Sequence, residues 1–498
     1  MNADIYLGID IGSSRLKAVA IDAGSGQALA MAGIALGVQH GSDGGCQVAA
    51  AAVGAALRQA LGAVVAQLGA RAASVRALGC TGHGAGLYAL DADGELAGGL
   101  AVSSTDQRAA ARVAALTQQH GAALFDDVGC APWAGQPTMI GAELRQREPQ
   151  RLRRVRHLLF AKDYLAWLLT GEIATDFSDA STAGLVALAS GEWSSLAFQH
   201  AGLADWAGLV PAAPVPSGTV IGRLRPAQAE ATGLRAGLPV AMGAIDLLAA
   251  MTGAGAIEPG HAVAVFGTWC VNSVIGPVLE PKPAVGNIVH LGRPGQRLYM
   301  ENSPASMANL AWLAATLRFP DIESVIDAAA GAPALANGLR FIPFLNGASA
   351  PSGASAAFIG LKGHHSRADM ARAVAEAVAA LHARHLSRLE SRGVPVSQVY
   401  ALGGGAQDVR LARWLAAMLA RPVQRVHDDE TGARGAALYA ALSDGVALGG
   451  PGSRLVAPSE TVDPQQHEVA AYAEFRAGFD ALIDGLAPLF ARLGGLTA

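Results

Sequence analysis

Cysteine, charge and long apolar runs are all scarce in this chain of 498 residues. Its four cysteines, Cys46, Cys80, Cys130 and Cys270, lie far apart and form no C-x-x-C pair. This spacing argues against a disulfide framework or a zinc site and favours a reducing compartment. Charged residues make up 15% of the chain and its formal net charge is −4, which speaks against nucleic acid as the main partner.

Targeting segments and several catalytic motifs are missing as well. No uninterrupted run of about 20 large apolar residues occurs, so we expect no membrane span. The opening MNADIYLGID has no basic region before an apolar run, and we therefore expect a cytoplasmic protein. The absence of G-x-x-x-x-G-K-[ST] excludes a P-loop kinase, and no G-x-G-x-x-G follows a strand with a matching acid. H-E-x-x-H and G-x-S-x-G are also absent.

What the chain does have is length, apolar residues and a weak internal repeat. About half of the residues are apolar, and the length suggests two large domains. In the first half we expect strands over 5–10, 16–21 and from 28 onward, then a helix, then a strand over 75–80. The second half shows a similar order, with strands over 261–266, 271–275 and 399–402 and a long helix after Ser366. The repeat predicts a duplicated fold with a cleft between the copies.

The first candidate for chemistry is a carboxylate followed by a turn of small residues. Asp10 ends the first expected strand, Gly12, Ser13 and Ser14 form the turn, and Lys17 lies on the returning strand. Exposed backbone N–H groups in such a turn can cradle a phosphate, and the carboxylate can hold Mg²⁺ through water. The alternative is an ordinary hairpin, because this motif occurs in many of them.

The second candidate is Asp246, which follows an apolar strand and opens an apolar helix. It is either the N-cap of that helix or a general base that takes the proton from a hydroxyl group attacking a γ-phosphate. Two glycine-rich turns come after it, Gly267-Thr268 and the segment from Gly403 to Gln407. Glycines at strand ends allow a nucleotide to approach the backbone closely, and they also form ordinary tight turns.

Taken in order, these segments resemble the FGGY family of carbohydrate kinases, and the resemblance extends from Tyr6 to about Leu442. The matching segments are YLGIDIGSSRLKAVAID, GCTGHGAGLYALD, SSTDQRA, DYLAWLLTGEIATDFSDAS, GAIDLLAAM, VFGTW, FIPFLNG, ALGGGAQDVRLARWLAAMLARPV and TGARGAALYAAL. The resemblance implies an α/β fold of two duplicated actin/hexokinase-like (ribonuclease H-like) domains flanking a central cleft. We expect an N-terminal sugar-binding domain over 1–242 and a C-terminal nucleotide-binding domain over 243–498.

The resemblance also implies a role for each candidate residue. Asp246 would be the catalytic base, with Asp10 and Asp246 facing Mg²⁺. The residues expected to contact ATP are Asp10, Gly12, Ser13, Ser14, Lys17, Gly267, Thr268, Gly403, Gly404, Gly405 and Gln407. The residues expected to contact the sugar are His83, Gly84, Asp106 and Asp246, with Trp133 as a wall.

Departures from the family pattern narrow the substrate. Ser103-Ser104-Thr105 replaces a usual tryptophan before Asp106, and this segment and Gly267-Thr268-Trp269 look most like the pentulose kinase branch, including L-xylulose kinases. We therefore expect ATP-dependent phosphorylation of a ketopentose, with xylulose to xylulose 5-phosphate preferred, by an enzyme that can form homodimers. The alternatives are another ketose or polyol (ribulose, erythritol or glycerol), a non-catalytic regulator that binds sugar and nucleotide, or a chaperone-like ATPase of the same superfamily.

Overall fold

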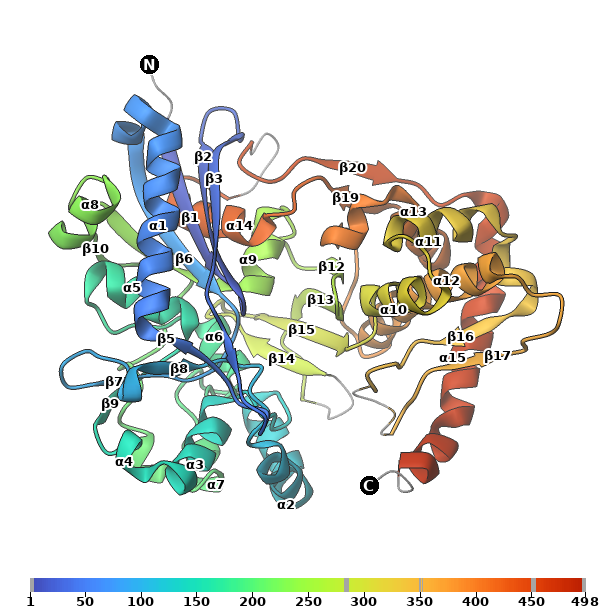
Figure 1. Cartoon of the computed structure of the whole chain (residues 1–498), viewed down its shortest axis with the longest axis horizontal. Coiled ribbons are helices and arrows are strands. Elements are labelled where there is room, and N and C mark those ends of the chain that lie inside the picture. The colour runs from blue at the N-terminus through green and yellow to red at the C-terminus, as the bar shows by residue number, and fades with distance from the viewer. Residues whose placement is uncertain (1–3, 282–285, 349–350, 352, 449–453, 495–498) are drawn as a thin grey trace. The chain divides into compact units, whose positions relative to one another are not determined.

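The computed structural model describes residues 4–281, 286–348, 351, 353–448 and 454–494, and the chain forms two compact units (Figure 1). The first unit comprises Met1–Ile257, Val278–Arg297 and Glu430–Ala457, and the second Glu258–Pro277, Leu298–Asp429 and Pro458–Ala498. The expected boundary between residues 242 and 243 differs from this division. The helix that begins at Asp246 stays in the first unit because it packs against the strand before it and against the helix that begins at Thr431.

The elements of the first unit are β1 (Ile5–Ile11), β2 (Arg15–Asp22), β3 (Ala28–Ala35), β4 (Gln39–His40), β5 (Cys46–Ala49), α1 (Ala50–Leu68), β6 (Val75–Gly82), β7 (Tyr88–Asp91), β8 (Leu100–Val102), α2 (Ala110–Val128), α3 (Pro137–Arg147), α4 (Pro149–Leu152), β9 (Val155–Leu159), α5 (Ala161–Thr170), α6 (Phe177–Thr182), α7 (Ser195–His200), β10 (Val220–Arg223), α8 (Pro226–Thr232), β11 (Pro239–Ile245), α9 (Asp246–Gly253), β14 (Asn287–His290) and α14 (Thr431–Ser443). Those of the second are β12 (His261–Phe266), β13 (Cys270–Pro277), β15 (Gln296–Ser303), α10 (Met307–Leu317), α11 (Ile322–Gly331), β16 (Arg340–Ile342), β17 (Ala357–Ile359), α12 (Arg367–Glu390), β18 (Gln398–Leu402), α13 (Val409–Leu419), β19 (Val423–Val426), β20 (Ser459–Val462) and α15 (Gln466–Gly494). Short 3₁₀ turns connect some of them.

The main sheets of the two units have the same strand order. In the first unit the order is β3-β2-β1-β6-β11-β10. Six strands of the other, seven-stranded sheet follow the corresponding order β15-β13-β12-β18-β19-β20. In both, the first strand in sequence pairs antiparallel with the next strand and parallel with the strand on its other side. The last strand of each order, β10 or β20, is antiparallel to its neighbour. The duplication expected from the sequence is therefore confirmed.

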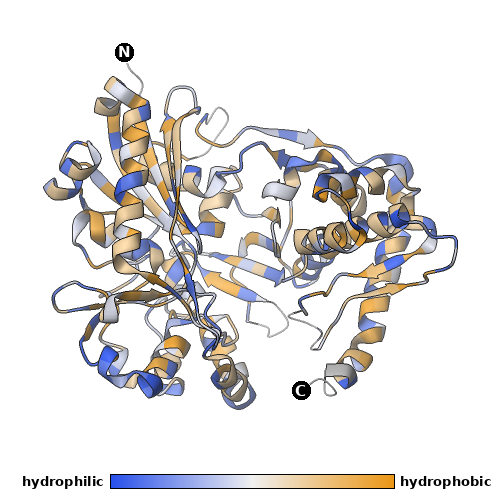
Figure 2. Ribbon diagram, viewed as in Figure 1, coloured by the Kyte–Doolittle hydropathy of each residue, from blue (hydrophilic) through white to orange (hydrophobic). Residues whose placement is uncertain are grey.

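Alternation along β1 directs side chains to two covered faces of the first sheet. Ile5, Leu7 and Ile9 belong to the same apolar cluster as residues of α1, whereas Tyr6 packs with residues of α14 on the opposite face. Figure 2 shows these apolar stretches along the central strands. Gly8 is required on the α14 face, because a Cβ there would lie 1.8 Å from the carbonyl oxygen of Ala433. Asp10 has the same parity as Tyr6 and Gly8, and so shares their face.

The helix α1 and the turn after it, Ala50–Ser74, are long and apolar enough to cross a membrane by length and composition. Within the described residues this is the one such helix. Its residues Val53, Leu57, Leu61 and Val64 are buried against the sheet of the first unit. This packing accounts for the apolar face of α1, since the core helix of a folded domain has the same composition.

Candidate active site

Three parallel strands of the first unit end side by side. In the register of β1 and β6, Ile11 lies opposite Gly82, and in the register of β11 and β6, Ile245 lies opposite the same Gly82. Asp10 is the residue before Ile11, and Asp246 is the residue after Ile245. The carboxyl ends of parallel strands are where ligands bind in open α/β sheets, and here this edge carries both predicted acids.

Asp10 is held in an environment that disfavours its charge. Burial raises the pKa of Asp10 to about 7, with a further contribution from the negative charges of Asp246 and Glu430 and an opposing one from Lys17. Its Oδ1 atom is buried and, within the part of the chain that the structure describes, has no hydrogen-bond partner. A Cβ at Gly432 would lie 2.8 Å from Asp10 Oδ2, so the absence of a side chain there leaves room beside the carboxylate.

The turn after Asp10 is open to solvent. The N–H of Gly12 donates to the carbonyl oxygen of Arg15 at 2.9 Å, which closes the turn, and Ser13 and Ser14 are exposed. Lys17 lies opposite Asp10 in the β1–β2 register, and its Nζ is 2.7 Å from Glu430 Oε2. The lysine predicted to face a phosphate is thus ion-paired with an acid at the start of α14.

Asp246 is the first residue of α9, and the N-cap of this helix is Ile245. Asp246 Oδ1 accepts a hydrogen bond from the Leu247 N–H at 2.7 Å. Burial raises the pKa of Asp246 to about 6, and the Leu247 hydrogen bond opposes this shift only in part. A carboxylate with a pKa just below neutral, at the edge of a site, is suited to act as a general base at pH 7.

The turn after β6 presents His83 and Gly84. His83 is buried, its Nδ1 lies 3.1 Å from Ser104 Oγ, and its Nε2 lies 3.5 Å from the Tyr88 hydroxyl oxygen. Burial lowers the pKa of His83 to about 4, so the ring is neutral at pH 7. Gly84 packs closely, because a Cβ there would lie 3.2 Å from Thr182 Cγ2. A neutral histidine offers one donor and one acceptor, and here the two ring nitrogens face the hydroxyl groups of Ser104 and Tyr88.

Asp106 and Trp133 shape the segment around Ser104. Both oxygens of Asp106 already have partners, since the Cys46 N–H donates to Oδ2 at 2.7 Å and the Arg108 side chain binds both oxygens. Asp106 therefore anchors the segment that carries Ser104. The Trp133 ring lies over Gly135, where a Cβ would be 2.4 Å from Trp133 Cζ3 and 1.8 Å from the Ser104 carbonyl oxygen. The structure thus brings His83, Ser104 and Trp133 into one neighbourhood.

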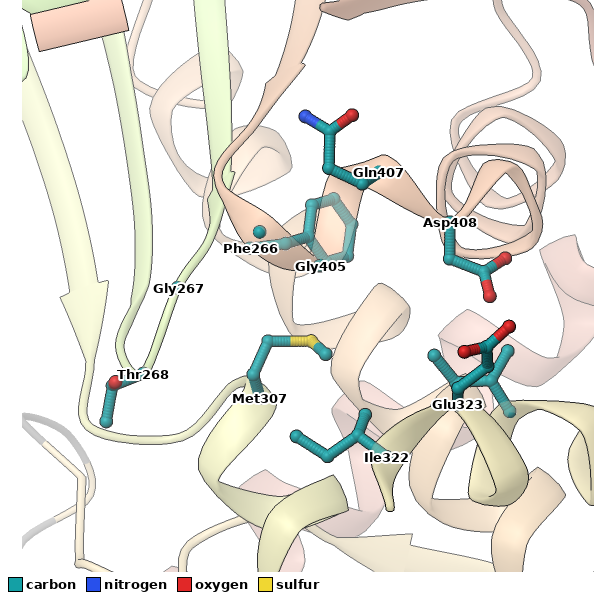
Figure 3. A pocket seen from close by; sticks show the side chains of 11 residues that line it. Phe266, Gly267, Thr268, Met307, Ile322, Glu323, Gly405, Gln407 and Asp408 are labelled. Carbon is teal, nitrogen blue, oxygen red and sulfur yellow. The ribbon is translucent and has the colours of Figure 1, made fainter. Parts of the chain in front are cut away.

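The second unit contains a cavity of about 580 Å³ (Figure 3), within the usual range for small-molecule sites. It is lined by Phe266, Gly267, Thr268, Met307, Ile322, Glu323, Ile326, Gly404, Gly405, Gln407 and Asp408. Five of these residues were predicted from the sequence as nucleotide contacts. In Figure 3, Thr268 lies at one end of the cavity and the carboxylates of Glu323 and Asp408 at the other.

Glycine is required at two positions around this cavity. Gly403 has a φ of 85°, and a Cβ there would also lie 3.0 Å from the Phe266 carbonyl oxygen. Gly405 lies against Met307, whose Sδ would be 2.5 Å from an added Cβ. The Met307 N–H in turn donates to the Gly267 carbonyl oxygen at 3.0 Å, which ties the β12–β13 hairpin to the start of α10. The cavity therefore has a backbone-lined wall that ligand atoms can approach closely.

A metal ion is compatible with the residues around Asp10, although few protein ligands are available. Within the described residues, no group of three or more His, Cys, Asp or Glu is arranged to hold a metal ion. The buried Asp10 Oδ1 that lacks a partner is nevertheless an oxygen ligand of the kind Mg²⁺ takes. Mg²⁺ commonly uses only one or two carboxylates, and completes its shell with water and phosphate oxygens.

Comparison with known proteins agrees with this geometry. A model of the N-terminal domain of the FGGY family of carbohydrate kinases matches residues 5–253, and one of the C-terminal domain matches residues 262–443. The chain belongs to the FGGY family of carbohydrate kinases. It is thus a sugar kinase with the two-domain α/β fold of that family, and the family, fold and enzyme class predicted from the sequence are confirmed.

Similar FGGY kinases carry names of pentulose kinases. The chain is 29% identical over 447 residues to the L-xylulose/3-keto-L-gulonate kinase of Escherichia coli K12, covering 89% of this chain and 88% of that one. It is 30% identical over 361 residues to the xylulose kinase of the same strain, covering 70% and 72%. The crystal structure of xylulose kinase from Rhodospirillum rubrum superimposes with a TM-score of 0.88 and 26% identity, over 98% of this chain and all of that one.

Sequence reasoning missed several residues of this FGGY site. In the sequence Glu430 is one of three consecutive acids, and its ion pair with Lys17 depends on a contact across more than 400 positions. Ser104 was visible only as a departure from the family pattern. Met307 and Ile322, which line the cavity, carry no motif at all. Helical apolar residues at such positions cannot be told from core residues by sequence alone.

Proposed function

We propose that this FGGY kinase transfers the γ-phosphoryl group of ATP to a ketopentose, with xylulose as the preferred substrate and xylulose 5-phosphate as the product. The observation that carries the proposal is Asp246, a carboxylate with a pKa of about 6 at the same strand edge as Asp10 and His83. The names of the relatives, L-xylulose kinase and xylulose kinase, support the choice of sugar. A cytoplasmic location and a homodimer stay predictions.

In the proposed mechanism, Asp246 takes the proton of the attacking sugar hydroxyl group as its oxygen bonds to the γ-phosphorus atom. The bond from that phosphorus atom to the bridging oxygen breaks, and ADP leaves with the electron pair. The protein contributes position and electrostatics rather than covalent chemistry. His83, Gly84 and Trp133 would hold the sugar, and Asp106 would hold Ser104 beside it.

Backbone groups and small side chains would bind the nucleotide. We propose that Gly403, Gly404, Gly405 and Gln407 hold the adenosine part, with Gly267 and Thr268 at the phosphates. Phe266, Met307 and Ile322 would provide apolar contacts for the base. Gly12, Ser13, Ser14 and Lys17 are proposed as further phosphate contacts. Asp10, with Asp246, would hold Mg²⁺, which neutralises phosphate charge when bound.

A coupled ADP-release assay tests the proposal. The panel contains D- and L-xylulose, D- and L-ribulose, erythritol and glycerol, each with Mg-ATP. We expect selective turnover of one xylulose enantiomer, with the other sugars at least tenfold poorer in kcat/KM. Preference for ribulose or a polyol would contradict the substrate assignment and leave the kinase class in place. Binding of sugar and nucleotide without any turnover would favour the regulator instead.

The change His83→Ala should raise the sugar KM by about tenfold or more and leave the ATP KM nearly unchanged. The physical reason is that the change removes a neutral, buried imidazole beside Ser104, and with it a proposed hydrogen bond to a sugar hydroxyl group. ATP is not proposed to contact this residue. Steady-state kinetics with each substrate varied in turn measures the effect. His120→Ala, in α2, serves as the matched control and should leave both constants unchanged. An equal rise in the two KM values would move His83 out of the sugar site.

A further inference from the structure

A fully buried cluster of one lysine and three aspartates lies in the first unit, next to the strand ends that carry the site. Lys162 Nζ is 2.5 Å from Asp163 Oδ1, 3.0 Å from Asp176 Oδ1 and 3.5 Å from Asp179 Oδ2. All four side chains are inaccessible to solvent. The proposed mechanism uses none of these groups. In the sequence, the three aspartates lie within the family-like segment DYLAWLLTGEIATDFSDAS, and Lys162 directly precedes it.

Such a cluster is a poor way to stabilise a fold. Removing charges from water costs more than an ion pair commonly returns, and well-packed apolar residues often do as well or better. Here three carboxyl groups surround one ammonium group, and burial raises the pKa of Asp163 and of Asp179. Burial alone would lower the pKa of Lys162, but the three carboxylates raise it, so the lysine stays charged at the centre. A role in position rather than stability accounts for this arrangement.

One branch of the cluster reaches the residue before the proposed base. Asp176, at the N-cap of α6, is bound to Lys162 through Oδ1, and its Oδ2 accepts a hydrogen bond from Ser178 Oγ at 2.6 Å. Ser178 Oγ in turn accepts the N–H of Ile245 at 2.9 Å. Since Ile245 is the N-cap of α9, this branch fixes the backbone from which the Asp246 side chain projects.

The other branch reaches the sugar-contacting turn. Asp179 Oδ1 accepts the N–H of Ala85 at 2.8 Å, while its Oδ2 faces Lys162. Ala85 has a φ of 61°, a left-handed conformation that is unfavourable for a residue with a Cβ. Strain of this kind persists where surrounding bonds hold the backbone, and it gathers at functional sites. The bond to Asp179 thus holds the turn that presents His83 and Gly84.

We propose that the Lys162 cluster is a positioning device that sets the proposed base and the sugar-contacting turn at a fixed spacing. Lys162 draws Asp176 and Asp179 to one point, and these acids hold Ile245 and Ala85 by their backbone N–H groups. The proposal rests on the proposed function, because it assigns Asp246 as the base. It adds Lys162, Asp176, Ser178 and Asp179 as positioning residues that need not touch the substrate.

The change Ser178→Ala tests the branch to Asp246 with the smallest disturbance. It removes one hydroxyl group and leaves the Asp176 cap and the lysine in place. We expect kcat to fall about 10- to 100-fold, as for a small displacement of a catalytic group, with the ATP KM within twofold of its original value. The matched control is Ser194→Ala, another buried serine whose hydroxyl group joins a helix N-terminus to a carboxylate, that of Asp127.

Thermal unfolding separates position from folding. The two serine variants should have similar Tm values, and only Ser178→Ala should lose kcat, with all rates measured well below Tm. Equal kcat values in the two variants would overturn the proposal. Lys162→Met should lower kcat and raise the sugar KM together, because both branches lose their centre. If this variant does not fold, Ser178→Ala still decides the question.

An Asp246→Asn variant in the same assay distinguishes a failure of the positioning role of the Lys162 cluster from a failure of the assignment of Asp246 as the base. Turnover lost in Asp246→Asn and retained in Ser178→Ala overturns the positioning role alone. Turnover retained in Asp246→Asn overturns the assignment of the base, and with it the positioning role as stated here. Loss in both, with Ser194→Ala unaffected, is the result that we expect.

Discussion

Replacement of Asp246 by asparagine should lower kcat by about 10²- to 10⁴-fold, the range typical of a lost general base. Asparagine has nearly the same shape and can still accept the Leu247 N–H, so α9 should begin as before. The loss should appear mainly in kcat, because Asp246 acts on a proton during the chemical step. Smaller rises in the sugar and Mg-ATP KM values would follow from its proposed contacts with the sugar and Mg²⁺. Rapid-quench measurement of sugar phosphate formation gives the rate of the chemical step.

The pH dependence provides the control for this variant. Because the pKa of Asp246 is raised to about 6, the base is ionised above pH 6 and protonated below it. At Mg²⁺ concentrations high enough to keep Asp10 ionised, wild-type kcat should therefore fall as the pH drops through about 6, and the residual activity of Asp246→Asn should lack this limb. Asp205→Asn, which removes a carboxylate paired with Arg145 elsewhere in the first unit, should retain full activity. An unchanged acid limb in Asp246→Asn would show that another group titrates there.

Asp10→Asn should lower kcat/KM for Mg-ATP by about 10²- to 10³-fold, comparable with the loss of one group that stabilises the transition-state charge. It should also raise the Mg²⁺ concentration needed for half-maximal rate, because an uncharged amide binds the ion less well. The sugar KM should be nearly unaffected. Magnesium titrations at fixed ATP measure the effect, and an unaltered magnesium requirement would contradict the role of Asp10.

The Asp10→Asn variant, which should lose activity, should not lose stability. The folded pKa of Asp10, about 7, is above its ordinary value of 3.8, so the fold loses stability as the pH rises from about 3.8 to about 7, and the full cost is present above pH 7. At pH 8 the neutral asparagine should therefore leave Tm unchanged or raise it. Asp22, at the other end of the β1–β2 pair, is the matched control. Burial would raise the pKa of Asp22, but hydrogen bonds from Ser25 and Arg71 outweigh it and hold the pKa low, so Asp22→Asn should lower Tm and spare activity.

Local signals in the sequence were enough for most of the fold. The strands β1, β2, β6 and β12 fall where alternation and turn residues predicted them. The long helix expected after Ser366 is α12, which begins with a capping box formed by Ser366 and Asp369. These features depend on residues within a few positions of one another, so the sequence alone predicts them.

The parts that the sequence did not reveal depend on contacts between distant segments. The boundary expected at residue 242 left α14 out of the first unit, although α14 covers the sheet of that unit. The small residues of α14 resemble those of any apolar helix, so the sequence does not show where it packs. The sequence did not indicate the Lys162 cluster either, since Asp176 and Asp179 resemble ordinary acids at the start of a helix until their burial is known. The burial of a charge is a property of the assembled fold.

The glycine contact between β1 and α14 also bears on how the chain folds as it is synthesised. Gly8 meets the backbone of Ala433, so one face of the first sheet is completed by a helix from near the other end of the chain. At typical synthesis rates of about 5–20 residues per second, roughly 20 to 70 s separate the emergence of β6 from that of α14. During this time the strands of the first unit expose an apolar face. Chaperones bind exposed apolar surfaces of this kind on nascent chains. A chain truncated before Thr431 should keep this face exposed and should therefore aggregate.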